Sequence, residues 1–259
     1  MRATALVLLL AAVLPSRAGQ AAEPRSLSVA VAANLKPAFE EMAARFQAAN
    51  PGVEVKATYG ASGIFFAQIA NGAPFDLFLS ADAGFPARVV AEGLAEGRAF
   101  TYAIGRLVVW VPNDSKIDLA GKGLRALLDP SVQKVAIANP EVAPYGRAAR
   151  QALERAGLQP ALAGRIVTGQ SVAQAAQFVE GGSAQAGFLP LSLALAPPLA
   201  AAGRTWPVPT SSHEPIEQAG VVLRGARQPV LARELATFLV GDAARGVLAR
   251  HGYDLPPPP

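Results

Sequence analysis

The stretch LSVAVAANL at residues 27–35 sets a pattern that the rest of the chain repeats. Its first six residues form a short apolar run, which is typical of a strand buried on both faces. From Leu35 onward, apolar residues recur with helical spacing, and Asn34 just before them is a common N-cap residue. The stretch therefore predicts a strand at 27–32, a tight turn at Ala33 and Asn34, and a helix at 35–47.

The same alternation continues along the chain. The predicted strands that follow are 53–58, 76–80, 106–111, 135–139, 165–168, 186–189 and 218–223. The predicted helices between and after them are 62–70, 82–92, 146–156, 171–179, 229–239 and 242–251. Strands alternating with helices through short turns indicate largely parallel sheets that helices cover on both faces. The Pro- and Ala-rich segment 197–215 is not expected to form regular structure.

We therefore predict an α/β fold with two lobes, each a mostly parallel sheet flanked by helices. The first lobe would comprise residues 23–103 and 205–259, and the second lobe, residues 104–204, would interrupt it. The two connections between the lobes would form a hinge that a bound ligand can close. In open α/β sheets, ligands bind beyond the carboxyl ends of the strands.

The ends and the composition of the chain point to export. Residues 1–22 combine a basic start, an apolar core and small residues near possible cleavage sites, as in a secretory signal peptide. With no Cys, the protein has no disulfides and depends on its core for stability. The net charge is +4, and the basic residues are scattered singly, so nucleic-acid binding is not expected.

Four predicted strand-to-helix turns end in small or hydroxyl residues and carry no Lys or Arg at the tip. They are 33–35, 60–63, 144–146 and 170–172. A helix start presents unpaired backbone N–H groups and a partial positive charge. Several helix starts that meet at one point would bind an oxyanion without an ionic partner, which favours a receptor over a catalyst. Taken singly, such residues are more often ordinary helix caps or packing residues.

Three stretches are similar to the periplasmic molybdate-binding proteins of bacterial ABC transporters. They are VAVAANL at 29–35, APFDLFLSAD at 73–82 and ANPEVAPYG at 138–146, and the resemblance extends over residues 26–253. It implies a two-lobed fold and a periplasmic protein that binds molybdate or tungstate and works with an ABC permease. It also implies a monomer that is not an enzyme, with no cofactor and no metal bound except as the oxyanion.

Matched by position, the resemblance implies four ligand-binding residues. Asn34 would donate from its backbone and side chain, Ser62 from its hydroxyl and N–H, and Val172 from its N–H; Ala33 is a possible addition. Tyr145 would donate from its N–H or its phenol. Some family members have a Tyr where this chain has Pro190, which cannot donate. Tyr145 is expected to replace it.

The ligand chemistry narrows the choice of anion only in part. Molybdate, tungstate and sulfate are fully deprotonated dianions that suit a site made of donors. Hydrogen phosphate carries a proton, and leaving it unpaired would cost about 1–3 kcal/mol. The residues do not separate molybdate from sulfate, so the same fold binding sulfate or another small anion is an alternative. A remote alternative is a secreted hydrolase using Ser62 and His213, because residues 60–63 nearly match a Gly-x-Ser-x-Gly turn.

Overall fold

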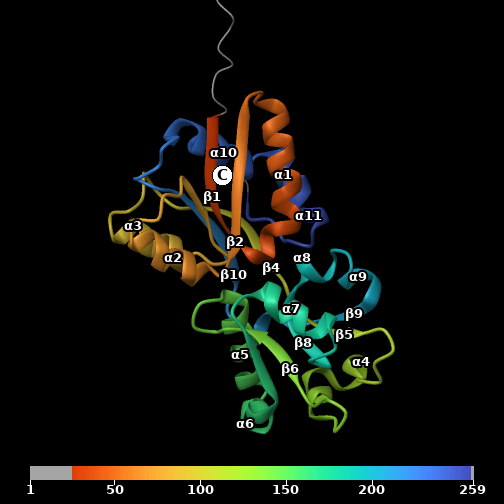
Figure 1. The fold of residues 1–259 in the computed structure, drawn as a ribbon. Helices are drawn as coiled ribbons and strands as arrows, with labels where there is room; N and C mark the ends of the chain where they lie inside the picture. The colour runs from red at the N-terminus through yellow and green to blue at the C-terminus, as the bar shows by residue number, and fades with distance from the viewer. Residues whose placement is uncertain (1–24, 258–259) are drawn as a thin grey trace, which may run out of the picture.

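The computed structural model describes residues 25–257, so the predicted signal peptide at 1–22 lies outside the described residues. Figure 1 shows two lobes, one above the other, each built on its own sheet. The upper lobe in Figure 1 contains both the first and the last elements of the described chain, and the lower lobe is inserted between them. The expected fold class, two hinged α/β lobes, is confirmed.

The first sheet has the strand order β2-β1-β3-β10-β4. β1 pairs in parallel with β2 and β3, whereas β10 runs antiparallel to β3 and β4. Half of the pairings are antiparallel, so the sheet is mixed and not mostly parallel as expected. The bounds are β1 Arg25–Ala32, β2 Val53–Gly60, β3 Leu77–Leu79, β4 Phe100–Gly105 and β10 Ile216–Val222. Its helices are α1 Lys36–Ala49, α2 Ser62–Ala70, α3 Gly84–Ala91, α10 Pro229–Val240 and α11 Asp242–Arg250.

Alternation along β1 explains how this sheet buries both faces. Val29 and Val31 pack with α1, α10 and α11, whereas Ala30 lies between them and packs with Phe65 of α2 and Phe85 of α3. Successive side chains of a strand point to opposite faces, so an uninterrupted apolar run needs helices on both sides. The predicted strand at 27–32 and the predicted helix at 62–70 are confirmed.

The second sheet repeats the plan with the order β7-β6-β8-β5-β9. β6 is parallel to β7 and β8, and β5 is antiparallel to β8 and β9. The strands are β5 Leu107–Pro112, β6 Val135–Ala138, β7 Ile166–Gly169, β8 Ala186–Pro190 and β9 Gly203–Pro207. The helices are α4 Leu119–Lys122, α5 Pro144–Arg155, α6 Gln159–Leu162, α7 Val172–Glu180, α8 Leu191–Ala194 and α9 Leu199–Ala202. Short 3-10 turns occupy Ala33–Leu35, Gly123–Leu128, Ala163–Arg165 and Thr210–Ser212.

The chain crosses between the lobes at two places. Only Arg106 separates β4 of the first sheet from β5 of the second, and the return lies between Pro207 and Ile216. The predicted lobe boundaries at 103/104 and 204/205 fall within β4 and β9 rather than at these crossings. The prediction of no regular structure at 197–215 was wrong, because β9 pairs with β5 as an edge strand, where proline at the end is tolerated.

Asn34 does not cap a helix as expected. A 3-10 turn, Ala33–Leu35, follows β1, and α1 begins at Lys36 without a side-chain cap. Capping by Ser171 is present, since its hydroxyl accepts from the N–H of Gln174 at 3.4 Å. The Asn34 side chain is instead used in tertiary contacts described below.

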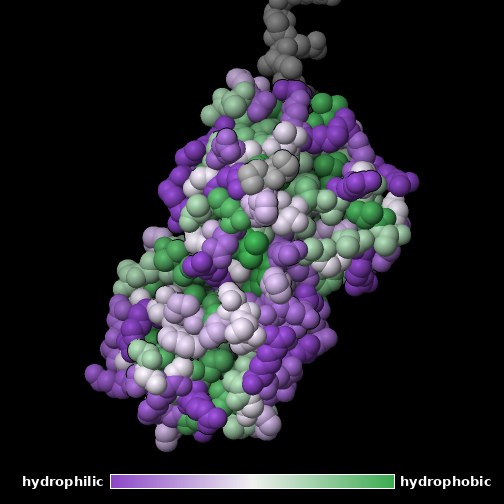
Figure 2. All heavy atoms as spheres, turned by 180° about the vertical axis from the view of Figure 1, so that it is seen from behind, coloured by the Kyte–Doolittle hydropathy of each residue, from purple (hydrophilic) through white to green (hydrophobic). Residues whose placement is uncertain are grey.

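Within residues 25–257, no helix combines the length and the apolar character that crossing a membrane requires. Figure 2, a view from behind, shows hydrophilic residues spread over both lobes with smaller hydrophobic areas among them.

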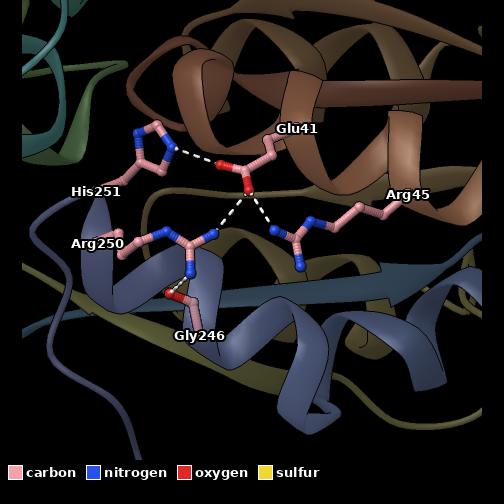
Figure 3. A network of polar contacts seen from close by, with 5 residues as sticks. All are labelled: Glu41, Arg45, Gly246, Arg250 and His251. Atoms are coloured by element: carbon pink, nitrogen blue, oxygen red, sulfur yellow. Dashed lines mark hydrogen bonds and ion pairs between the residues drawn. The ribbon is translucent and has the colours of Figure 1, made fainter.

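A cluster of charged side chains joins α1 to the C-terminal helix α11 (Figure 3). One carboxylate oxygen of Glu41 accepts from Arg45 and from Arg250, at 2.7 Å each, and the other lies 3.2 Å from Nε2 of His251. Partial burial tends to raise the pKa of Glu41, but the hydrogen bonds from His251 and Arg250 outweigh it and hold that pKa below its usual value.

We expect Glu41→Gln to lower the thermal stability slightly at neutral pH. A carboxylate whose pKa is lowered by folding stabilises the protein above its unfolded pKa, and this stabilisation is lost as the pH falls through the folded value. Because the cluster is partly exposed, the loss should not exceed about 1 kcal/mol. Thermal unfolding of both proteins across the acidic range should show the difference vanish at low pH. Glu40→Gln, which removes only a long contact to Lys36 of 3.9 Å, is the control.

Candidate functional site

A small cavity lies between the lobes, at the carboxyl ends of β1, β2, β6 and β7. The space between its lining atoms, part of it open to solvent, is about 200 Å³. All four candidate residues, Asn34, Ser62, Tyr145 and Val172, line it, together with Ala33. The other lining residues are Ala32, Gly60, Ala61, Ala81, Ala143 and Pro144. The structure thus brings together the residues that the sequence singled out from two lobes.

Three of the candidate residues lie at helix N-termini. Ser62 and Val172 are the first residues of α2 and α7, and Tyr145 is the second residue of α5. Within the described part of the chain, their backbone N–H groups have no hydrogen-bond partner. Three positive helix ends therefore converge on the cavity with donors that the protein itself does not use.

Ser62 lines the cavity, and its hydroxyl accepts one hydrogen bond within the protein. The residue is only 1 % exposed, and its Oγ accepts from the backbone N–H of Ala81 at 2.9 Å. The hydroxyl hydrogen remains available, because a hydroxyl can accept and donate at once.

The side chain of Asn34 does not have the role that was expected for it. Both of its amide hydrogens are donated within the protein, to Oε1 of Gln218 and to the phenol of Tyr253, at 2.9 Å each. The side-chain donation expected from Asn34 is therefore not available in this arrangement. Its backbone N–H has no partner in the described residues and remains a possible donor.

The Tyr145 phenol lies at the junction of the lobes. Its oxygen accepts from Nε2 of Gln218 at 2.9 Å, and a Cβ added at Gly105 would lie 2.1 Å from it, so the close approach needs glycine there. Burial and the neighbouring phenols of Tyr253 and Tyr102 raise the pKa of Tyr145 well above its usual value. The phenol is therefore neutral at physiological pH and keeps its hydrogen. Pro190, at the end of β8, is not among the residues that line the cavity.

The cavity is neutral, and charges lie outside it. The lining residues include no Lys, Arg, Asp or Glu. Nearby, Arg147 of α5 forms an ion pair with Asp82, which follows β3 in the other lobe. Two further contacts join the lobes: the N–H of Gly63 donates to the carbonyl of Val142 at 2.8 Å, and the Ser192 hydroxyl donates to the carbonyl of Asn34 at 2.9 Å.

We expect Arg147→Gln to accelerate ligand release. Asp82 would lose its partner across the cleft, and a partly exposed pair of this kind contributes up to about 1 kcal/mol, or roughly fivefold in affinity. Stopped-flow measurement of the dissociation rate checks this. Arg150→Gln is the matched control, because Arg150 lies one turn further along α5 and pairs with Glu141 and Glu154 of its own lobe. Equal release rates in the two variants would contradict a role for the ion pair in closure.

The hydrolase alternative is contradicted by the contacts of its two residues. The Ser62 hydroxyl contacts Ala81, whereas the His213 ring has Nδ1 at 2.7 Å from the carbonyl of Glu214 and Nε2 buried without a partner in the described chain. A nucleophile and its base need to be within hydrogen-bond reach. Among residues 25–257, no group of His, Asp and Glu side chains is arranged to hold a metal ion.

A neutral, donor-lined cavity between two hinged α/β lobes defines a solute-binding protein. The chain belongs to the family of bacterial extracellular solute-binding proteins, whose model matches residues 27–254. It is 39% identical to the molybdate-binding protein ModA of Azotobacter vinelandii, over 96% of this chain and 97% of that protein. It is 37% identical to ModA of Rhodobacter capsulatus, over 97% of this chain and 94% of that protein.

A solved structure gives the same picture of the fold. The periplasmic molybdate-binding protein of Azotobacter vinelandii superposes with a TM-score of 0.82 at 36% sequence identity. The match covers 89% of this chain and 99% of that chain.

Proposed function

We propose that this protein captures molybdate between its two lobes in the periplasm and delivers it to an ABC permease. The observation that carries the proposal is the convergence of three helix N-termini, with unused N–H groups, on a neutral cavity. The names of its relatives, molybdate-binding proteins at 37% and 39% identity, support molybdate as the anion. Residues 1–22 would direct export and be removed.

Each candidate residue has a proposed part in binding. The N–H groups of Asn34, Ser62, Tyr145 and Val172 donate to the oxygens of the anion, and the Ser62 hydroxyl adds a further donor. The Tyr145 phenol supplies the hydrogen that is not used inside the protein. Every oxygen of a fully deprotonated dianion is an acceptor, so donors alone satisfy it, and the charge is spread over several dipoles.

Tungstate has the same charge and the same acceptor geometry, so we propose that it binds at the same site. Sulfate shares these properties too, and only the size of the cavity distinguishes it. Binding of the anion would close the lobes as a hinge, and the closed form would be the one that the permease recognises.

The test is calorimetric titration of the mature protein with molybdate, tungstate, sulfate and phosphate, supported by thermal unfolding. A ligand at 100 times its dissociation constant adds about 2.7 kcal/mol to the free energy of unfolding, which shifts the melting temperature by several degrees. We expect strong binding of molybdate and tungstate and weak binding of phosphate. Sulfate binding equal to or tighter than molybdate would keep the site but change the ligand, and no binding of any of the four would refute an oxyanion site.

A further inference from the structure

Behind the cavity, four buried side chains form one continuous chain of hydrogen bonds, which we call the buried relay. It runs from Tyr253 through Asn34 and Gln218 to Tyr145. Gln218 lies on β10, is completely buried, and precedes an irregularity in the pairing of β10 with β4. The relay joins the C-terminal segment and the first lobe to a cavity residue of the second lobe.

The direction of each hydrogen bond in the relay follows from the one before it. The Tyr253 phenol donates its single hydrogen to the backbone carbonyl of Asn34 at 2.9 Å, so its oxygen can only accept from the Asn34 side chain. Asn34 must therefore present its NH₂ group. The second hydrogen of that group points to Gln218, which must present its carbonyl oxygen, Oε1, to receive it.

The last hydrogen bond of the relay makes the Tyr145 phenol an acceptor toward Gln218. With Oε1 turned to Asn34, the NH₂ group of Gln218 faces the Tyr145 oxygen and donates to it. The phenol of Tyr102 lies 3.2 Å from the same Oε1, but its single hydrogen has a shorter partner in the carbonyl of Ser80 at 2.8 Å, so the orientation of Gln218 is set by Asn34 alone. Tyr145 thus accepts from Gln218, and in the described residues it donates its own hydrogen to no protein group. A bound anion in the cavity that Tyr145 lines would accept this hydrogen.

We propose that Gln218 is a positioning residue that keeps Tyr145 a hydrogen-bond donor and so makes the site select fully deprotonated oxyanions over protonated ones. This inference rests on the proposed function. A freely rotating phenol could turn its oxygen toward the proton of hydrogen phosphate and accept it. In the relay, that oxygen is already occupied by Gln218, so the proton would stay unpaired.

Gln218→Glu tests the proposal because it replaces a donor by an acceptor of nearly the same shape. Tyr145 would then donate to the new carboxylate, and its oxygen would be free to accept within the cavity. The measurement is the ratio of molybdate affinity to phosphate affinity in mildly alkaline buffer. At this pH, phosphate is mainly a dianion that carries one proton. The negative charge of the new Glu side chain therefore weakens the binding of molybdate and of phosphate alike. We expect the ratio to fall by at least about tenfold; an unchanged ratio overturns the proposal.

Two further variants keep the test decisive. Tyr253→Phe changes neither the charge nor the lining of the cavity, but it allows the side-chain amides of Asn34 and Gln218 to rotate by 180° and exchange their oxygen and nitrogen. We therefore expect the ratio of molybdate affinity to phosphate affinity to fall severalfold. This variant carries the test if Gln218→Glu does not fold. In a Tyr145→Phe background, Gln218→Glu should leave the ratio unchanged, because Gln218 acts through Tyr145; a further fall there would contradict the positioning role.

The outcomes separate this inference from the proposed function. Failure of the wild-type protein to bind molybdate would refute the proposed function itself. Wild-type binding of molybdate, together with an unchanged ratio in Gln218→Glu and Tyr253→Phe, would refute only the role of Gln218.

Discussion

Ser62→Ala is expected to weaken molybdate binding by about 1.5–3 kcal/mol, or roughly tenfold to 150-fold. Ser62 is 1 % exposed, its Oγ accepts from the N–H of Ala81, and its hydroxyl hydrogen has no partner in the described residues. The substitution removes a donor to a charged ligand at a buried position, where no solvent molecule replaces it at the same strength.

Calorimetric titration of wild type and variant checks this value, and thermal unfolding without ligand separates it from a loss of stability. Ser171→Ala is the matched control. Ser171 also stands at a helix start and its hydroxyl caps α7, but it is not among the residues that line the cavity. It should lower stability by about 0.5–2 kcal/mol with little change in affinity. Wild-type affinity in Ser62→Ala would remove this hydroxyl from the site.

The two-lobed fold could be predicted from the sequence because each lobe repeats one local signal. Apolar strands such as residues 27–32 alternate with helical patterns such as residues 62–70, and local periodicity reports both. The antiparallel strands β5 and β10 were also predicted, at 106–111 and 218–223, but their direction was not. β4 and β9 were missed, because only Arg106 separates β4 from β5 and β9 is an exposed edge strand between prolines.

The cavity lining could be predicted in part, and the buried relay could not. Ser62, Tyr145 and Val172 follow strands at turns that the sequence marks, so topology alone brings them to one edge of each sheet. The role of Asn34 depends on Gln218 and Tyr253, which lie 184 and 219 residues further along the chain. The local sequence around an asparagine at a helix start is the same whether its side chain caps that helix or binds a residue distant in the sequence. The one visible sign was Gln218 at the start of the apolar run 219–223, because a buried amide needs partners.

A backbone donor can also be removed alone, and Val172→Pro does so at the first residue of α7. Proline is tolerated at this position of a helix, since the N–H has no partner within the helix. Ser171 before it is already extended, with φ −142° and ψ 170°, which suits a residue that precedes proline. The helix should therefore form, and the protein should lose one N–H directed at the cavity.

We expect Val172→Pro to weaken molybdate binding by about 1.5–3 kcal/mol while α7 remains folded. Val172→Ala is the control: it removes a similar share of the packing of this buried side chain but keeps the N–H, so its affinity should stay near that of wild type. Calorimetry gives the affinities, and circular dichroism and thermal unfolding report the fold. Equal affinities in the two variants would mean that this helix end does not bind the anion. A loss confined to proline would show that the backbone N–H of Val172 binds the anion.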